Sequence, residues 1–215
     1  AKWMYQIALP SECSEGSFIA PTLFEIDSIR ELKREVFGPV LHIVRFQSRE
    51  LPQLIRDINA TGYGLTLGIH SRIDETIDLI TSTAHVGNIY VNRNIVGAVV
   101  GVQPFGGEGL SGTGPKAGGP LYLYRLLSTR PADAIEQSFA KVDAISAPDT
   151  QAREALSKPL KALQSWAQNN QQAALAELCS EFAAHSQSGI TRLLNGPTGE
   201  RNSYAILPRE HVLCL

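Results

Sequence analysis

The sequence has few cysteines, little net charge and no long apolar run. Only three of its 215 residues are cysteines, at positions 13, 179 and 214. Cysteines so few and so far apart suit neither a disulfide framework nor a zinc cluster, so we expect reduced thiols in a reducing compartment. The formal net charge of -2 gives no electrostatic reason to expect nucleic acid or an anionic membrane as a partner.

Targeting and metal-binding patterns are also missing. No stretch reaches the roughly 18 consecutive apolar residues that a membrane-spanning helix needs. The amino end lacks the basic and apolar pattern of a secretion signal, and we therefore predict a cytoplasmic protein. The five histidines show no metal-ligand spacing, so no metal site is predicted.

Both ends of the chain predict a fragment of a longer polypeptide. The sequence does not begin with Met, and Ala1 opens within a pattern that is already under way. At the other end, the apolar residues 212–215 resemble a strand that nothing follows to pair or cover it.

The first region of the chain, residues 1–130, alternates short strand-like runs with helical stretches. This pattern favours an α/β architecture with a largely parallel open sheet. The expected strands are residues 18–20, 40–46, 65–70 and 87–92, and the expected helices are residues 50–59 and 74–83.

Beyond Pro131 the composition shifts to Ala, Gln and Leu, which predicts a helical connector over residues 131–195. Apolar residues recur at helical spacing in two segments, at Leu156, Leu160 and Leu163 and at Leu175, Leu178 and Phe182. Pro159 is expected near the start of the first helix. A turn at residues 195–199 then opens a carboxyl-terminal region, residues 196–215, with strands expected at 204–207 and 212–215.

More than half of the 18 glycines lie in one stretch, residues 86–127, between two strand-like runs. A connection this long without regular structure is uncommon in a compact domain unless it binds or covers something. Residues 107–112 satisfy the dinucleotide-binding string GxGxxG, but the glycines and prolines that follow prevent a helix from opening there. Pro115 also occupies the position where a phosphate-binding loop requires lysine. We therefore predict a functional loop that is not a nucleotide signature.

Several separated motifs point to one family. They are Pro21-Thr22-Leu23, Glu35-Val36-Phe37-Gly38-Pro39-Val40, Tyr63-Gly64-Leu65, Pro104-Phe105-Gly106-Gly107 and Ser111-Gly112. In this order, over residues 18–127, they resemble the carboxyl-terminal half of the aldehyde dehydrogenase superfamily. The resemblance implies that family's catalytic-domain fold over residues 1–130.

Finer detail resembles one branch of that superfamily. Residues 91–94, 97–101 and 114–120 are similar to the dehydrogenases of glutamate semialdehyde, the open form of pyrroline-5-carboxylate. The tail, at residues 196–202 and 208–214, resembles the segment that follows this enzyme where it is fused to a proline dehydrogenase in the bifunctional proline utilisation proteins. The resemblance implies the second step of proline oxidation to glutamate, with NAD as its cofactor and FAD in a proline dehydrogenase domain outside this chain.

The catalytic groups of the superfamily are not in this sequence. Its chemistry needs a cysteine thiolate that attacks the aldehyde and a carboxylate that activates water. None of the three cysteines stands in the family's sequence around the nucleophile. No catalytic residue is therefore predicted, and the chain by itself is expected to be inactive.

The resemblance does imply binding residues. Glu35 would accept hydrogen bonds from the nicotinamide ribose hydroxyls, and Phe37 would pack near the nicotinamide ring. The backbone N–H groups of Gly97 and Ala98 would hold the substrate carboxylate, and Phe105 would line its aliphatic part. From the residues alone, Glu35 could instead pair with a neighbouring Lys or Arg, and the Gly97–Ala98 segment could be a plain surface loop.

Two other functions remain open. The chain could be a non-catalytic lid or interaction segment, in which the glycine loop and the tail close a passage between two active sites. It could also belong to an aldehyde dehydrogenase of another substrate class. The implied partners are glutamate semialdehyde, the rest of the parent polypeptide and further copies in a homo-oligomer.

Overall fold

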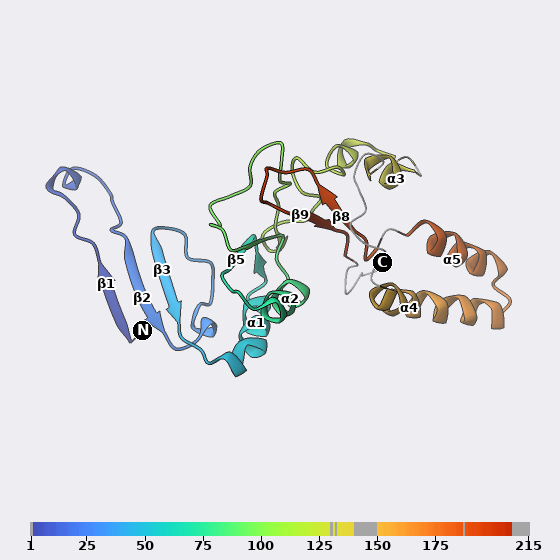
Figure 1. The fold of residues 1–215 in the computed structure, drawn as a ribbon, viewed down its shortest axis with the longest axis horizontal. Coiled ribbons are helices and arrows are strands. Elements are labelled where there is room, and N and C mark those ends of the chain that lie inside the picture. Colours follow the sequence, from blue (N-terminus) through green and yellow to red (C-terminus); the bar gives the residue numbers. More distant parts are fainter. Residues whose placement is uncertain (1, 130, 132, 140–149, 187, 208–215) are drawn as a thin grey trace. The chain divides into compact units, whose positions relative to one another are not determined.

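The computed structural model describes residues 2–129, 131, 133–139, 150–186 and 188–207. The chain divides into two compact units, and each is described by itself. Figure 1 colours the chain from blue at the amino end to red at the carboxyl end. Unit 1 comprises Ala1–Gly97 and Phe105–Ala117, and unit 2 comprises Ala98–Pro104 and Gly118–Leu215. Within the described ranges, no helix is long and apolar enough to cross a membrane.

The first sheet of unit 1 has three strands. β2 (Thr22–Ile26) lies between β1 (Trp3–Gln6), to which it is antiparallel, and β3 (Val40–Val44), to which it is parallel. Thr22 is buried at the start of β2, where its hydroxyl donates to the carbonyl of Ala20 at 2.8 Å and accepts from Gln6 at 3.0 Å. These bonds satisfy a polar side chain that would otherwise be costly to bury.

The strand expected at residues 18–20 is wrong. Phe18 and Ile19 are 58% and 68% exposed and have no regular structure. Pro21 follows them and has no N–H to donate to a strand ladder. The strand begins at Thr22, whose N–H donates to the carbonyl of Pro39 at 2.9 Å.

A β-α-β unit follows in unit 1. After α1 (Leu51–Asn59), the strand β5 (Thr66–Ile69) runs parallel to β6 (Asn88–Val91), and α2 (Asp74–Thr83) connects them. The expected strands at 40–46, 65–70 and 87–92 and both expected helices are confirmed, with bounds that differ by at most two residues at either end. The two parallel pairs agree with an α/β class, and a single open parallel sheet stays a prediction.

The glycine-rich stretch of residues 86–127 has little regular structure after β6. Only β7 (Glu108–Gly109) forms a strand, antiparallel to β4 (Tyr63–Gly64). The apolar run at the end of this stretch is not a strand. It forms a 3-10 helix, η4 (Leu123–Leu126), because its N–H groups bond to carbonyls three residues earlier, as from Arg125 to Tyr122 at 3.3 Å.

Besides the 3-10 helix η4, unit 2 contains three α-helices and a hairpin among its described residues. They are α3 (Ala134–Phe139), α4 (Thr150–Asn169), α5 (Ala173–His185), and the antiparallel strands β8 (Thr191–Leu194) and β9 (Asn202–Ala205). Figure 1 shows α4 and α5 side by side. Ala167 and Cys179 are buried at 0% and 3% exposure. Phe139 packs on Tyr204, with ring centroids 5.8 Å apart.

Two expectations for unit 2 need correction in detail. Both amphipathic helices are present, but Pro159 lies in the interior of α4 and not near its start. Because proline has no N–H, α4 lacks one backbone hydrogen bond there. The fixed φ of proline is compatible with a helix, and α4 continues past Pro159 to Asn169. The strand expected at 204–207 begins two residues earlier, at Asn202. The strand expected at 212–215 and the cysteine at 214 lie outside the described residues.

The close packing at Gly87 generates a first prediction. A Cβ on Gly87 would lie 1.9 Å from the carbonyl oxygen of Gly106, which is backbone and cannot turn away. We expect Gly87→Ala to destabilise the protein by on the order of 1–3 kcal/mol. The measurement is the thermal or urea midpoint of the complete polypeptide.

Gly68→Ala is the matched control. Its Cβ would lie 2.4 Å from Cγ2 of Ile95, a side chain that is 46% exposed and can rotate. We expect a clearly smaller loss than at Gly87. Equal losses would show that the contact with the Gly106 carbonyl does not limit this site.

Candidate functional site

The loop from Phe105 to Ala117 is closed on itself and fixed to the strands of unit 1. The backbones of Phe105 and Ala117 exchange two hydrogen bonds, at 3.0 and 2.9 Å. The side chain of Asn88, on β6, accepts from the N–H of Gly106 at 3.1 Å. The hydroxyl of Ser111 accepts from the N–H of Gly64 at 3.1 Å. Hydrogen bonds therefore fix the two ends of the loop to each other and attach Gly106 and Ser111 to the strands of unit 1.

Glycine is required in this loop because backbone packs directly on backbone. A Cβ on Gly107 would lie 2.6 Å from both Cβ and the carbonyl oxygen of Ser111. Gly109 has φ 58°, and its Cβ would lie 2.4 Å from the carbonyl oxygen of Gly62. No helix opens within residues 107–112, which confirms that the GxGxxG string there is not a dinucleotide signature.

Lys116 is the one cation of this closed loop, and sequence reasoning did not select it. Its side chain is half-buried against Gly106. Burial lowers the pKa of the Lys116 ammonium from its ordinary value, and the negative charge of Glu108 opposes this shift in part. A desolvated ammonium at this place favours anions in its surroundings.

The segment expected to hold the substrate carboxylate is a tight turn. The carbonyl of Val99 accepts from the N–H groups of Val102 and Gln103, at 3.1 and 2.9 Å. Among the described residues, the N–H groups of Gly97 and Ala98 donate to no protein atom. These two donors therefore have no acceptor within the described part of the chain.

The residues expected to contact the cofactor lie in the loop before β3. Glu35 is exposed, and Phe37 is 86% exposed. Within the described part of the chain, the Glu35 carboxylate makes neither an ion pair nor a hydrogen bond, so the alternative of local pairing with Lys33 or Arg34 is not observed. Gly38 follows with φ 133°, and a Cβ added to it would meet no atom within 4 Å.

The five expected site residues come from three loops. Glu35, Phe37, Gly97 and Phe105 belong to unit 1, and Ala98 belongs to unit 2. Sequence reasoning missed Asn88, Lys116 and Gln103. No local signal marks these side chains, because each acts on a segment that is distant in sequence or is buried only by the folded loop.

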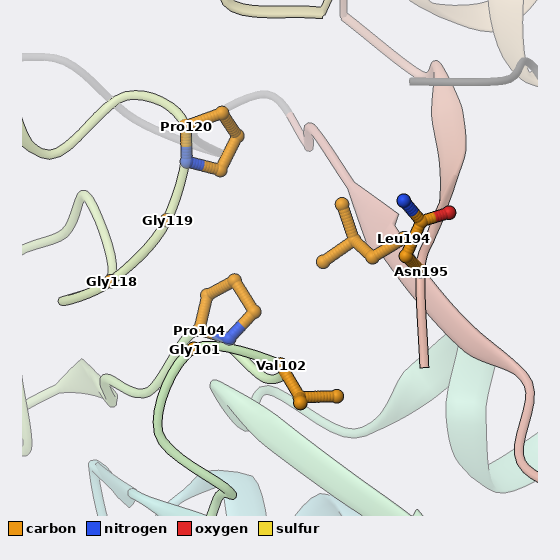
Figure 2. A pocket seen from close by; sticks show the side chains of 8 residues that line it. All are labelled: Gly101, Val102, Pro104, Gly118, Gly119, Pro120, Leu194 and Asn195. Carbon is orange, nitrogen blue, oxygen red and sulfur yellow. The ribbon is translucent and has the colours of Figure 1, made fainter. Parts of the chain in front are cut away.

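A shallow hollow of about 300 Å³ lies within unit 2 (Figure 2). It is lined by Gly101, Val102, Pro104, Gly118, Gly119, Pro120, Leu194 and Asn195. Figure 2 shows Leu194 and Asn195 across the hollow from Pro104 and Pro120. None of these side chains is charged, so the hollow offers no ion pair to a carboxylate or phosphate.

The chain belongs to the aldehyde dehydrogenase family, whose profile matches residues 1–131. It is similar to bifunctional protein PutA of Escherichia coli (strain K12), with 61% identity over 95% of this chain and 15% of that protein. It is also similar to 1-pyrroline-5-carboxylate dehydrogenase of Bacillus subtilis (strain 168), with 44% identity over 51% of this chain and 21% of that protein.

Among solved structures, the chain is similar to a mutant of Bradyrhizobium japonicum proline utilization A. The identity is 63% over 51% of this chain and 11% of that chain, with a TM-score of 0.49. The chain thus spans only a small part of the relatives that it matches, 15% in the case of the Escherichia coli protein.

The lowered pKa of Lys116 predicts a pH-dependent stability. The unfolded chain, with the ordinary pKa of 10.5, binds this proton more readily than the folded chain does. Stability therefore rises with pH from the folded pKa up to 10.5. We expect Lys116→Met to be more stable than the unsubstituted protein near pH 8, and the difference to shrink as pH approaches 10.5.

Melting temperatures of the complete polypeptide across this pH range test the expectation. Lys161→Met, at an exposed position on α4, is the matched control. Its stability difference from the unsubstituted protein should not shrink as pH rises. A difference for Lys116→Met that stays constant or widens with pH would contradict a desolvated ammonium.

Proposed function

We propose that this chain is part of an NAD-dependent L-glutamate γ-semialdehyde dehydrogenase in a bifunctional polypeptide, acting in the second step of proline oxidation to glutamate. One observation carries the proposal. The family profile ends at residue 131, but the 61% identity to bifunctional protein PutA extends over 95% of the chain. The similarity to the separate 1-pyrroline-5-carboxylate dehydrogenase covers only 51%. The region beyond the family domain therefore favours the bifunctional arrangement.

Glu35 and Phe37 are proposed to bind NAD. A carboxylate without a protein partner offers two acceptor oxygens to ribose hydroxyls, and the exposed ring of Phe37 offers an apolar surface to the nicotinamide. When bound, NAD supplies the acceptor for the hydride of the aldehyde. These residues of the chain bind and orient; none of them is proposed to exchange a proton or a covalent bond with the substrate.

Gly97, Ala98 and Phe105 are proposed to bind glutamate semialdehyde. Successive N–H groups with no protein acceptor can hold a carboxylate without a formal positive charge. The half-buried ring of Phe105 would line the aliphatic part of the substrate. A substrate without a carboxylate would gain nothing from these donors, which separates this proposal from an aldehyde dehydrogenase of another substrate class.

Other parts of the activity are assigned outside the chain. We propose that the nucleophilic cysteine, the water-activating carboxylate and an FAD-dependent proline dehydrogenase domain belong to the rest of the polypeptide, in a cytoplasmic homo-oligomer. Within the chain, residues 1–130 would be the dehydrogenase portion, residues 131–195 a helical connector and residues 196–215 the start of a carboxyl-terminal region.

The competing proposal is a non-catalytic lid or interaction segment, in which the glycine loop and the tail close a passage between two active sites. Large apolar side chains on α4 and α5 are exposed, among them Trp166 at 53% and Phe182 at 61%. Exposed apolar surface of this kind favours contact with another part of the polypeptide. Removing the residues after Arg130 from the complete polypeptide would abolish such a role; full activity without them would contradict it.

Ala98→Asp tests the carboxylate site. It places a negative charge where the substrate carboxylate is proposed to lie, and like charges about 4 Å apart at an effective dielectric near 20 repel by about 4 kcal/mol. We expect kcat/KM for glutamate semialdehyde in the complete polypeptide to fall nearly a thousandfold. Pentanal, which has no carboxylate, should lose far less.

Ala98→Asn is the uncharged control of similar size and should reduce both substrates modestly. Equal losses for both aldehydes with Ala98→Asp would mean that the substitution damages the loop. No loss for either would place the substrate elsewhere in the protein.

Glu35→Ala tests the cofactor site. It removes one or two hydrogen bonds to ribose hydroxyls, worth on the order of 1–3 kcal/mol, so the KM for NAD should rise by about fivefold to about a hundredfold. The melting temperature should change little, because the carboxylate makes no hydrogen bond or ion pair in the described structure. Glu35→Gln keeps one acceptor oxygen, so its KM for NAD should lie between those of the unsubstituted protein and of Glu35→Ala. An unchanged NAD dependence would remove Glu35 from the cofactor site.

A further inference from the structure

The side-chain amide of Gln103 uses every one of its polar atoms. Its oxygen Oε1 accepts from the N–H of Val99 at 3.0 Å. Its nitrogen Nε2 donates to the carboxylate of Glu200 at 3.0 Å and to the side-chain oxygen of Asn202 at 3.3 Å. One half-buried side chain thus joins two segments that are almost a hundred residues apart in sequence.

At one end of this link, Gln103 holds Val99 from both sides. Its side chain accepts from the Val99 N–H, and its own N–H donates to the Val99 carbonyl at 2.9 Å. The tip of the turn has no comparable support, since Val100 is 97% exposed. Val99 directly follows Ala98, so the position of the proposed carboxylate donor depends on this peptide.

At the other end, Gln103 contacts the β8–β9 hairpin. Asn202 begins β9 opposite Leu194, and the N–H of Glu200 donates to the carbonyl of Pro197 at 3.2 Å. The hairpin turn also packs closely, because a Cβ on Gly196 would lie 2.1 Å from Nδ2 of Asn202. All of these groups belong to unit 2.

We propose that Gln103 is a positioning residue that makes recognition of the substrate carboxylate depend on the β8–β9 hairpin. The inference rests on the proposed function of Gly97 and Ala98. An amide suits this role because it accepts from a backbone N–H at one atom and donates to a carboxylate at the other. The hairpin lies beyond residue 131, so a segment outside the family domain sets the specificity of a site inside it.

Gln103→Glu breaks the link at one end only. The new carboxylate still accepts from the Val99 N–H and can accept from a flipped Asn202 amide, but it cannot donate to Glu200 and faces the charge of that residue. In the complete polypeptide, we expect kcat/KM for glutamate semialdehyde to fall about tenfold. The value for pentanal should change less than about twofold, because pentanal brings no carboxylate to the loop.

The double variant Gln103→Glu with Glu200→Gln restores the link with its direction reversed. The amide introduced at position 200 donates to the carboxylate introduced at position 103. Nδ2 of Asn202 is buried and has no partner among the described residues, so a flip of this amide supplies a second donor. We expect glutamate semialdehyde oxidation to recover to within about threefold of the unsubstituted protein.

Gln53→Glu is the matched control. Gln53 donates to Asp57 at 2.7 Å on the exposed face of α1, so the same substitution again sets a carboxylate against a carboxylate. Both aldehydes should be oxidised as by the unsubstituted protein. Hydrogen exchange of the Val99 amide should accelerate in Gln103→Glu, because the acceptor at position 103 is then no longer held by Glu200 of the hairpin, and it should slow again in the double variant.

Three results would overturn the inference: equal losses for both aldehydes in Gln103→Glu, no loss for either, or no recovery in the double variant. The unsubstituted polypeptide tests the proposed function separately. If its kcat/KM shows no preference for glutamate semialdehyde over pentanal, the proposed function fails. In that case the inference fails with it. If that preference is present, the results for the variants decide whether Gln103 has the proposed positioning role.

Discussion

Direct contact of backbone with backbone is the constraint on which the rest of unit 1 depends. The loop from Phe105 to Ala117 and the segments around Gly64 and Gly87 are packed so closely that a single Cβ on either glycine would overlap a carbonyl oxygen, at 2.2 and 1.9 Å. The glycines bring no side chain to these contacts, and the side chains of Asn88 and Ser111 fix the distance by accepting hydrogen bonds from the N–H groups of Gly106 and Gly64. A glycine loop is often taken as flexible, but this one is restrained because its glycines allow close packing.

A restrained backbone is also what the proposed carboxylate site at Gly97 and Ala98 would need. A carboxylate held by backbone N–H groups needs those groups at fixed positions, since no flexible cation adjusts to the ligand. The proposed anchor at Gly97 and Ala98 leads directly into a turn that Gln103 closes. The half-buried ammonium of Lys116 adds positive charge to unit 1, and it forms no ion pair with any described residue.

The similarity to longer proteins extends into the second half of the chain, which the family profile does not cover. Residues beyond 131 are outside the family profile, yet the similarity to bifunctional protein PutA includes them. In the structure, the hairpin in this region bonds to Gln103 through Glu200 and Asn202. The carboxyl-terminal region thereby supports the turn from Val99 to Gln103, which belongs to the same unit.

Much of the secondary structure was predictable because helices and strands follow local spacing. Asp74–Thr83 was predicted residue for residue, and α1 differed by one residue. The prediction failed at residues 18–20, where apolar composition suggested a strand but Pro21 and the pairing with Pro39 moved its start to Thr22. It also failed at η4, where an apolar run found no partner strand and bonded to itself.

The sequence by itself determined the family, the α/β pattern and the identity of the glycine-rich stretch, because motifs and periodicity are properties of neighbouring residues. The tertiary structure alone decided which side chains support that stretch. Gln103 bonds to residues 97 and 99 positions away, and Ser111 bonds to one 47 positions away. Nothing in the local sequence encodes such partners, since a hydrogen bond between distant segments exists only after folding has brought donor and acceptor within about 3 Å.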